Sequence, residues 1–226
     1  MRNNDSLAGY LFALPSLIFL GIFIIYPMVS SLILSFVKWD LLSPNIIFVG
    51  IGNYLKLFKA PLFYKVLKNT LIFTIGSVAL VMVLAILLAV ILNQKLRAKN
   101  FYRSLIFSPY ITPMVVIAII WMWIYNPEFG LANYFLQLVG IPPLNWLRSF
   151  KMALPSIIFL TVWKDMGYYM ILYLAGLQNI PESLYESAEM DGASGFRKFR
   201  SITLPLLTPT TFFVLITSFL SSFKVF

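Results

Sequence analysis

The sequence of 226 residues contains no cysteine and no histidine, and only 11% of its residues are charged. Without those two side chains the chain cannot form a disulfide, a thiolate nucleophile, an imidazole base, or the usual zinc and haem ligand sets. Most familiar catalytic constellations are therefore excluded, and we expect neither a metal site nor a cofactor. A soluble domain carries about 25% charged residues. The low charge content thus indicates that lipid surrounds much of this chain.

A nucleotide-binding loop is missing as well. The pattern G-x-x-x-x-G-K-[ST] does not occur, and none of the 11 glycines is followed by lysine. Such a loop needs its glycines for close backbone approach and its lysine for the phosphates. We therefore expect this chain not to hydrolyse ATP and not to be an enzyme.

Acidic residues are scarce relative to basic ones. The chain has 17 Lys and Arg against 8 Asp and Glu, a formal net charge of +9. In a soluble protein this excess would suggest nucleic acid. In a membrane protein, loop cations hold the orientation of the helices and meet anionic lipid headgroups. We expect contact with membrane lipid and none with nucleic acid.

Long apolar runs provide the membrane-spanning segments that the composition indicates. Four runs without a charged residue exceed the roughly 20 residues that a helix needs to cross the hydrocarbon layer. The first is far longer than the about 7 to 15 residues of a signal-peptide core, so we expect it to stay uncleaved. The four predicted spans lie near residues 9–37, 70–92, 104–125 and 204–223.

A fifth predicted span, near residues 154–178, carries Lys164 and Asp165 close to its middle. Two charges cost together about 5 to 7 kcal/mol in the bilayer centre, which roughly cancels the gain from the apolar residues of this segment. The charged side should therefore face a protein interior or a watery path. Neighbouring side chains point about 100° apart on a helix, so we expect partners on other helices and poor mutual neutralisation. The fold class is an all-α integral membrane protein with five predicted transmembrane helices.

Loop charges barely decide the orientation. With the amino terminus inside, the cytoplasmic segments hold eight cations and the outer ones seven. The short loop from Asn93 to Arg103 contains four cations and no acid, which favours a cytoplasmic amino terminus. On the opposite side, residues 53–67 alternate Lys with Leu and Phe, a pattern that predicts a short helix in the membrane interface.

The most polar stretch, from Ile180 to Pro209, lies between the last two spans. It predicts two short helices around a turn, because Glu182 suits a helix start, Gly192 can supply a left-handed residue and Ser194 can cap a second helix. Its first half is acidic and its second half basic. A solvated surface loop would explain these features equally well.

The spacing of this stretch, however, is specific. Glu186-Ser187-Ala188, three residues, Gly192, nine residues and then Ile202-Thr203-Leu204-Pro205 resemble the EAA loop of the permease subunits of binding-protein-dependent ABC importers. The one departure is Ser187 in place of the usual alanine. Further segments, GYLFALPSLIFLGIFIIYP, FVGIGNYLKLF and WKDMGYYMILYLAGLQNIPESLYESAEMDGAS, are similar to the carbohydrate-uptake permeases, specifically the first permease of the sugar and glycerol-phosphate group. The resemblance covers nearly the whole chain.

The resemblance implies a cytoplasmic coupling loop over residues 181–205 that seats in a groove of an ATPase subunit. Residues expected to couple are Glu186, Ser187, Ala188, Asp191, Gly192, Ile202, Leu204 and Pro205. Implied partners are a second permease, two ATPase subunits and an extracytoplasmic solute-binding protein, in the cytoplasmic membrane of a bacterium or archaeon. The family core usually has at least six spans, so we expect this sequence to be a fragment lacking the final helix.

The predicted function is thus half of an alternating-access pathway for a sugar or related polyol, driven by ATP that binds elsewhere. The alternative is an ATP-independent secondary transporter or channel that uses Lys164 and Asp165. Aromatic faces and charged hydrogen-bonding groups suit polyhydroxyl ligands. Candidate pathway residues are accordingly Trp163, Lys164, Asp165, Tyr168 and Tyr169.

Overall fold

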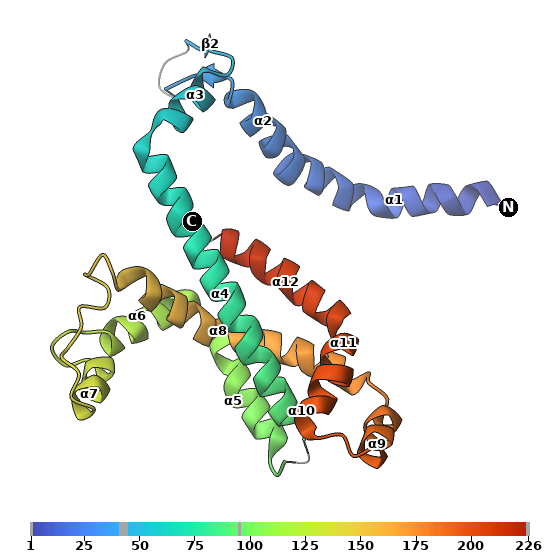
Figure 1. The fold of residues 1–226 in the computed structure, drawn as a ribbon. Helices are drawn as coiled ribbons and strands as arrows, with labels where there is room; N and C mark the ends of the chain where they lie inside the picture. Colours follow the sequence, from blue (N-terminus) through green and yellow to red (C-terminus); the bar gives the residue numbers. More distant parts are fainter. Residues whose placement is uncertain (1, 41–44, 95, 225–226) are drawn as a thin grey trace. The chain divides into compact units, whose positions relative to one another are not determined.

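The chain is almost entirely helical in a computed structural model, which describes residues 2–40, 45–94 and 96–224 (Figure 1). This confirms the predicted all-α membrane fold. The chain forms two compact units, residues 1–67 and 68–226, and each is described by itself. The boundary between the two units falls within the long helix Pro61–Asn93, so the first turns of that helix belong to the first unit.

The first unit is dominated by a continuous helical run that passes through one π-helical segment. Its elements are α1 (Arg2–Leu20), η1 (Gly21–Ile25), α2 (Tyr26–Leu34), β1 (Val37–Lys38), β2 (Ile47–Phe48) and α3 (Gly52–Lys59). Residues Gly9–Leu34 are long and apolar enough to cross a membrane. The two-residue antiparallel pair β1–β2 was not predicted from the sequence.

Asn53 holds this small hairpin to the end of α2. Its side-chain amide donates to the carbonyls of Ser35 and Val37, both at 2.9 Å. The short helix predicted over residues 53–67 ends earlier, because Ala60 adopts an extended conformation. The remaining residues, from Pro61 onward, begin the long helix α4.

The second unit contains the other helices. They are α4 (Pro61–Asn93, from Lys68), α5 (Lys99–Ile111), α6 (Met114–Ile124), α7 (Leu131–Leu138), α8 (Ala153–Gln178), α9 (Glu182–Met190), α10 (Gly195–Lys198), η2 (Phe199–Thr203), α11 (Leu204–Leu206) and α12 (Thr208–Phe223). Helices α4 and α8 are each long and apolar enough to be a span. Two further candidates are bent pairs, α5 with α6 at 99° and α10–α11 with α12 at 66°. Including Gly9–Leu34, the described residues thus offer three unbroken candidate spans, or five if each bent pair counts as one.

A single core joins α4, α8 and α12. Small residues let the helices approach, since Ala85 and Ala89 of α4 are fully buried. Met170 and Tyr173 of α8 and Val214 of α12 fill the same cluster. A smaller cluster places Ile117 and Trp121 of α6 against Leu160 of α8. Helix α8 therefore contributes to both clusters and is the central element of this unit.

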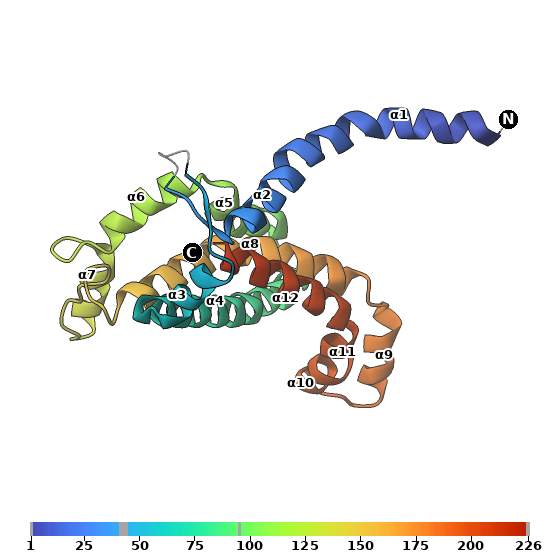
Figure 2. The same ribbon diagram turned by 90° about the horizontal axis from the view of Figure 1, so that it is seen from above.

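Two groups of short helices lie at opposite ends of the second unit. In both views α9 runs beside α10 and α11 at one end, and α7 lies at the other (Figures 1 and 2). The end with α9 is where the chain leaves α8 and where α4 finishes. This arrangement puts the predicted coupling loop at one face of the helical core.

Candidate functional site

The predicted coupling loop forms a helical hairpin, which we define as residues 182–206. Its first arm, α9, begins directly after Pro181, and Gly192 closes the turn with a φ of +72°. Glycine alone adopts this left-handed conformation without steric cost. Ser194 then caps α10, its side chain accepting a hydrogen bond from the backbone N–H of Arg197. The left-handed glycine and the serine cap were both predicted from the sequence, and both are confirmed.

Two side-chain contacts tie the arms of the hairpin together. The hydroxyls of Tyr185 on α9 and Thr203 on η2 are 2.9 Å apart, and Thr203 is buried. Nearer the tip, Lys198 donates to Glu189 at 2.5 Å. This hydrogen bond, together with the positive charge of Lys198, lowers the pKa of the Glu189 carboxyl. The acidic arm and the basic arm are therefore held together by a hydrogen bond and an ion pair.

The tip of the hairpin is open to a partner. Three of the predicted coupling residues, Glu186, Asp191 and Gly192, are exposed. Met190 is 90% exposed and Phe196 is 74% exposed. Exposed apolar side chains rimmed by charges are typical of protein contacts. Sequence reasoning missed both, although their position inside a polar loop was a usable signal.

The second arm continues into α12 through a hydrogen-bonded bend. Ile202 lies in η2, and Leu204 and Pro205 form α11. The N–H of Leu207 donates to the carbonyl of Thr203, and the N–H of Thr211 donates to Leu207. Two backbone hydrogen bonds thus flank the 66° bend, although Pro205 and Pro209 have no N–H to donate. These bonds connect the second arm of the hairpin to α12.

The other predicted residues lie on α8, opposite a break in the helix pair α5–α6. Thr112 and Pro113 are both extended, so α5 ends at Ile111 and the chain turns by 99°. The last carbonyls of a helix lack intrahelical donors. Lys164 supplies one, because its ammonium lies 3.2 Å from the carbonyl oxygen of Tyr110. A cation at a helix carboxyl end is favourable.

Lys164 also contacts its neighbour Asp165, with Nζ and Oδ1 3.7 Å apart. The sequence predicted poor mutual neutralisation of these two charges, and the structure gives a long ion pair whose separation exceeds that of a good hydrogen bond. The expected partner on another helix is present as well, in the Tyr110 carbonyl and the Tyr110 ring, whose centroid is 5.0 Å from the ammonium. Tyr168 stacks on the same ring at 4.5 Å.

The structure divides the predicted pathway residues between two sides of α8. Asp165 and Tyr169 line a cavity of about 10 Å³ together with Ser77, Ser218 and Ser222. This volume suits about one water and no sugar. Trp163 instead borders a cavity of about 380 Å³, lined also by Ser108, Pro109, Thr112 and Met166 of the broken pair and of α8. The five residues therefore do not form one continuous wall.

Asn133 is an organising residue that sequence reasoning missed. It is 2% exposed, and its amide donates to the carbonyls of Pro127 and Leu144 at 3.1 Å. Its oxygen accepts from the N–H of Leu144 at 3.0 Å and from the indole of Trp146 at 2.9 Å. One side chain thus fixes the loop after α7. No local sequence motif predicts this role of Asn133, because its hydrogen-bond partners come together only when the loop folds.

Comparison with known proteins identifies the family to which the chain belongs. Residues 81–226 match the family model described as binding-protein-dependent transport system inner membrane component. The chain belongs to this family. It is 36% identical to a probable ABC transporter permease protein, YurN, of Bacillus subtilis, over 100% of this chain and 78% of that protein. It is also 36% identical to the trehalose/maltose transport system permease protein MalF of Thermococcus litoralis, over 100% of this chain and 77% of the relative.

A solved structure supports this family assignment. The crystal structure of a bacterial ABC transporter involved in the import of the acidic polysaccharide alginate superposes with a TM-score of 0.83 at 26% identity, covering 99% of this chain and 75% of that one. The chain is therefore a multi-pass inner-membrane permease component of a binding-protein-dependent ABC transporter, and the ATPase is a different component. The predicted permease identity is confirmed. The family assignment also decides against the ATP-independent alternative.

Proposed function

We propose that this permease forms half of an alternating-access pathway for a sugar or related polyol. Its partners would be a second permease, two ATPase subunits and an extracytoplasmic solute-binding protein. The family description supports the binding protein. Support for a carbohydrate comes from the names of similar proteins, which concern trehalose and maltose in one case and alginate in another. The particular solute would be selected by the binding protein.

The observation that carries the proposal is the helical hairpin, whose two arms are held together by side-chain contacts. Its tip exposes acids and Met190, its arms are joined by Tyr185–Thr203 and Glu189–Lys198, and two backbone hydrogen bonds at Leu207 link its second arm to α12. A helical hairpin whose arms are joined in this way can move as a rigid body when a partner protein presses on its tip. Closure of the ATPase pair against the tip would therefore move α12 and its neighbour α8.

The proposal requires the hairpin and the amino terminus to face the cytoplasm. The natural sequence contains no cysteine, so a single introduced cysteine is a unique label in this chain. Met190→Cys should react with a membrane-impermeant maleimide only after the inner face is opened. Val139→Cys, 71% exposed at the end of α7, should react from outside. Labelling of Met190→Cys in intact cells would refute the proposed orientation.

The decisive functional test is Gly192→Val. A β-branched residue cannot adopt φ of +72° without strain, so the turn should open and solute uptake should stop while the protein stays in the membrane. Gly140→Val is the matched control, since Gly140 has φ of +77° and, like Gly192, open space around its Cα. It imposes the same strain outside the hairpin and should leave uptake largely intact. Normal uptake by Gly192→Val, measured with radiolabelled solute, would contradict the coupling role.

For the pathway we propose the side of α8 that faces the α5–α6 break. Lys164 and Tyr168 lie there beside the freed carbonyl and the ring of Tyr110, and Asp165 is paired with Lys164 from the edge of the small cavity. Polar groups within a membrane core are costly and mark transport routes. Trp163 borders the neighbouring cavity and Tyr169 the small one. Lys164→Ala and Asp165→Ala should each reduce uptake, and normal transport by both would remove these residues from the pathway.

A further inference from the structure

A hollow of about 310 Å³ lies between the hairpin and the ends of two candidate membrane spans. Four segments form it: the end of α4, the end of α8, the first arm of the hairpin and the second arm. Its lining residues are Val90, Asn93, Gln94, Leu177, Tyr185, Gly195, Lys198, Phe199 and Thr203. The hollow is behind the exposed tip, and none of the predicted coupling residues lines it.

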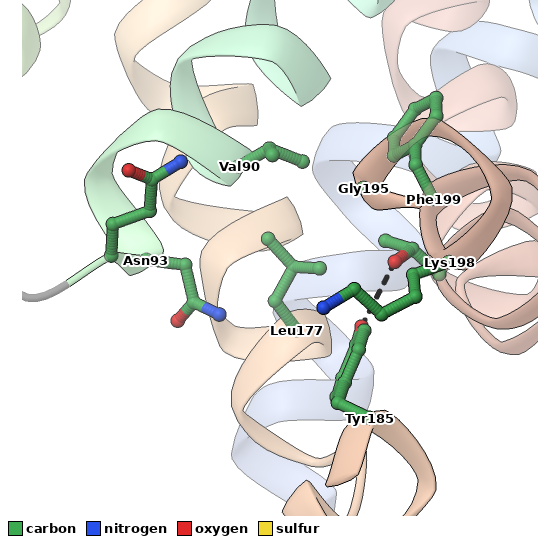
Figure 3. A pocket seen from close by; sticks show the side chains of 9 residues that line it. Val90, Asn93, Leu177, Tyr185, Gly195, Lys198 and Phe199 are labelled. Carbon is green, nitrogen blue, oxygen red and sulfur yellow. Dashed lines mark hydrogen bonds between the residues drawn. The ribbon is translucent and has the colours of Figure 1, made fainter. Parts of the chain in front are cut away.

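The lining is divided into an apolar part and a polar part. Val90, Leu177 and Phe199 contribute hydrocarbon surface, whereas Asn93, Gln94 and Lys198 contribute hydrogen-bond donors. Figure 3 shows the Lys198 side chain reaching across the hollow toward Leu177, with Asn93 on the opposite wall. The side-chain amides of Asn93 and Gln94 have no hydrogen-bond partner among the residues that the structure describes. Three donors thus face a space bounded by apolar side chains.

With α4 and α8 as membrane spans, the hollow lies at the level of a membrane face. Helix α4 ends at Asn93 and α8 ends at Gln178, and both are candidate spans. A site at this depth meets the headgroup on one side and the first carbons of the acyl chains on the other. Lysine side chains near span ends place their ammonium in this layer. The charge on Lys198, with a side chain only 20% exposed, therefore sits where lipid phosphates are found.

We propose that this hollow binds a membrane phospholipid, whose phosphate accepts hydrogen bonds from Lys198 and the amides of Asn93 and Gln94 while its upper acyl chain packs on Val90, Leu177 and Phe199. Glu189 competes for the same ammonium, because it is paired with Lys198 in the structure. The lipid joins the end of α4 to the hairpin. This proposal depends on the membrane placement of α4 and α8 and not on contact with an ATPase.

The competition gives variants with opposite effects. Lys198→Gln removes the cation and should weaken lipid binding roughly tenfold, the loss typical of one charge-assisted hydrogen bond. Glu189→Gln breaks the same ion pair but frees the ammonium, so it should strengthen binding. Because both variants disrupt the hairpin tie, a general loss of structure cannot produce this pattern. Val90→Trp fills the hollow without touching a charge and should also abolish binding.

The experiment uses the purified full-length importer, stripped of lipid in detergent and titrated with phosphatidylglycerol, with retained lipid counted by native mass spectrometry. Lys99→Gln is the matched control, since Lys99 is an exposed lysine at the start of α5 that does not line the hollow. It should behave like the wild type. Equal losses for Lys99→Gln and Lys198→Gln would reduce the effect to general surface charge and overturn the proposal. Binding of inorganic phosphate at Lys198 without retained lipid would overturn it as well.

Discussion

Two candidate spans of the second unit are broken next to prolines, yet the breaks differ in what happens to the backbone. Between α5 and α6, Thr112 and Pro113 are extended, and a lysine from another helix bonds the freed carbonyl of Tyr110. Between α11 and α12, Leu207 remains near helical geometry and its hydrogen bonds continue on both sides. The sharper bend is 99° and the milder one 66°.

The difference separates a chemical role from a mechanical one. A break that opens the hydrogen-bond ladder leaves polar groups inside the membrane, and these need partners that a ligand could also supply. A bend that stays near helical geometry and keeps hydrogen bonds on both sides of Leu207 changes the direction of the chain and leaves fewer polar groups without partners. Helix α8 packs against both regions with a glycine, Gly167 against α5 and Gly176 against Leu207 and Thr210.

The largest effect is expected for Gly167→Ala. The added Cβ would lie 2.1 Å from the carbonyl oxygen of Ile106 and 2.8 Å from the Cα of Phe107, and backbone atoms cannot rotate away. Overpacking costs typically about 1–3 kcal/mol and more where nothing can yield. We expect little monodisperse permease in size-exclusion chromatography of solubilised membranes. Gly195→Ala, with open space around its Cα, is the control. Wild-type elution of Gly167→Ala would show that α5 and α8 do not pack this closely.

A smaller but clear effect is expected for Lys164→Met, which tests the open break. It leaves the Tyr110 carbonyl without its donor and Asp165 without its cation. A buried acceptor without a partner costs about 1–3 kcal/mol. The thermal midpoint of the purified importer should fall, and the double variant Lys164→Met/Asp165→Leu should fall by less than the sum of the single variants. Strict additivity would mean that the two charges do not interact.

Gly176→Ala tests the closed break and should be milder than Gly167→Ala. Here the new Cβ meets side-chain atoms, Thr210 Oγ1 at 2.6 Å and Leu207 Cδ2 at 2.9 Å, which can move. We expect about 1 kcal/mol of destabilisation and a higher ratio of ATP hydrolysed to solute transported. Adding Thr210→Ala should restore part of the loss, because it removes the nearest atom. If the double variant is no better than the single one, the crossing of α8 and α12 is not as described.

The smallest effect concerns acidification of the hairpin. The pKa of Glu189 is lowered in the folded protein, so its stabilising bond to Lys198 is present above the ordinary carboxyl range of about 4.3 and is lost as the pH falls through the lowered pKa. Spin labels at Glu186→Cys and Phe196→Cys should report a broader distance distribution on acidification. Glu189→Gln should show the broad distribution at every pH. A narrow distribution in that variant would mean that Tyr185–Thr203 alone holds the arms.

Local chemistry made the hairpin predictable, whereas long-range contacts did not. The turn at Gly192 and the cap at Ser194 follow from residues a few positions apart. The bend of the third span does not follow so simply, because Pro109 is accommodated inside α5 and the helix ends only before Pro113. The partner of Lys164 is 54 residues away in the sequence. Such a pairing depends on how helices cross, which hydropathy does not encode.

The fully satisfied amide of Asn133 has a consequence for the segment around α7. The side-chain amide, with both donors and its acceptor engaged, binds the backbone of Pro127 and Leu144 and the indole of Trp146 at once, so it ties the two ends of the segment from Pro127 to Trp146 together. The entropy cost of ordering this segment is therefore already met when the chain folds, and binding elsewhere in the molecule does not have to include it.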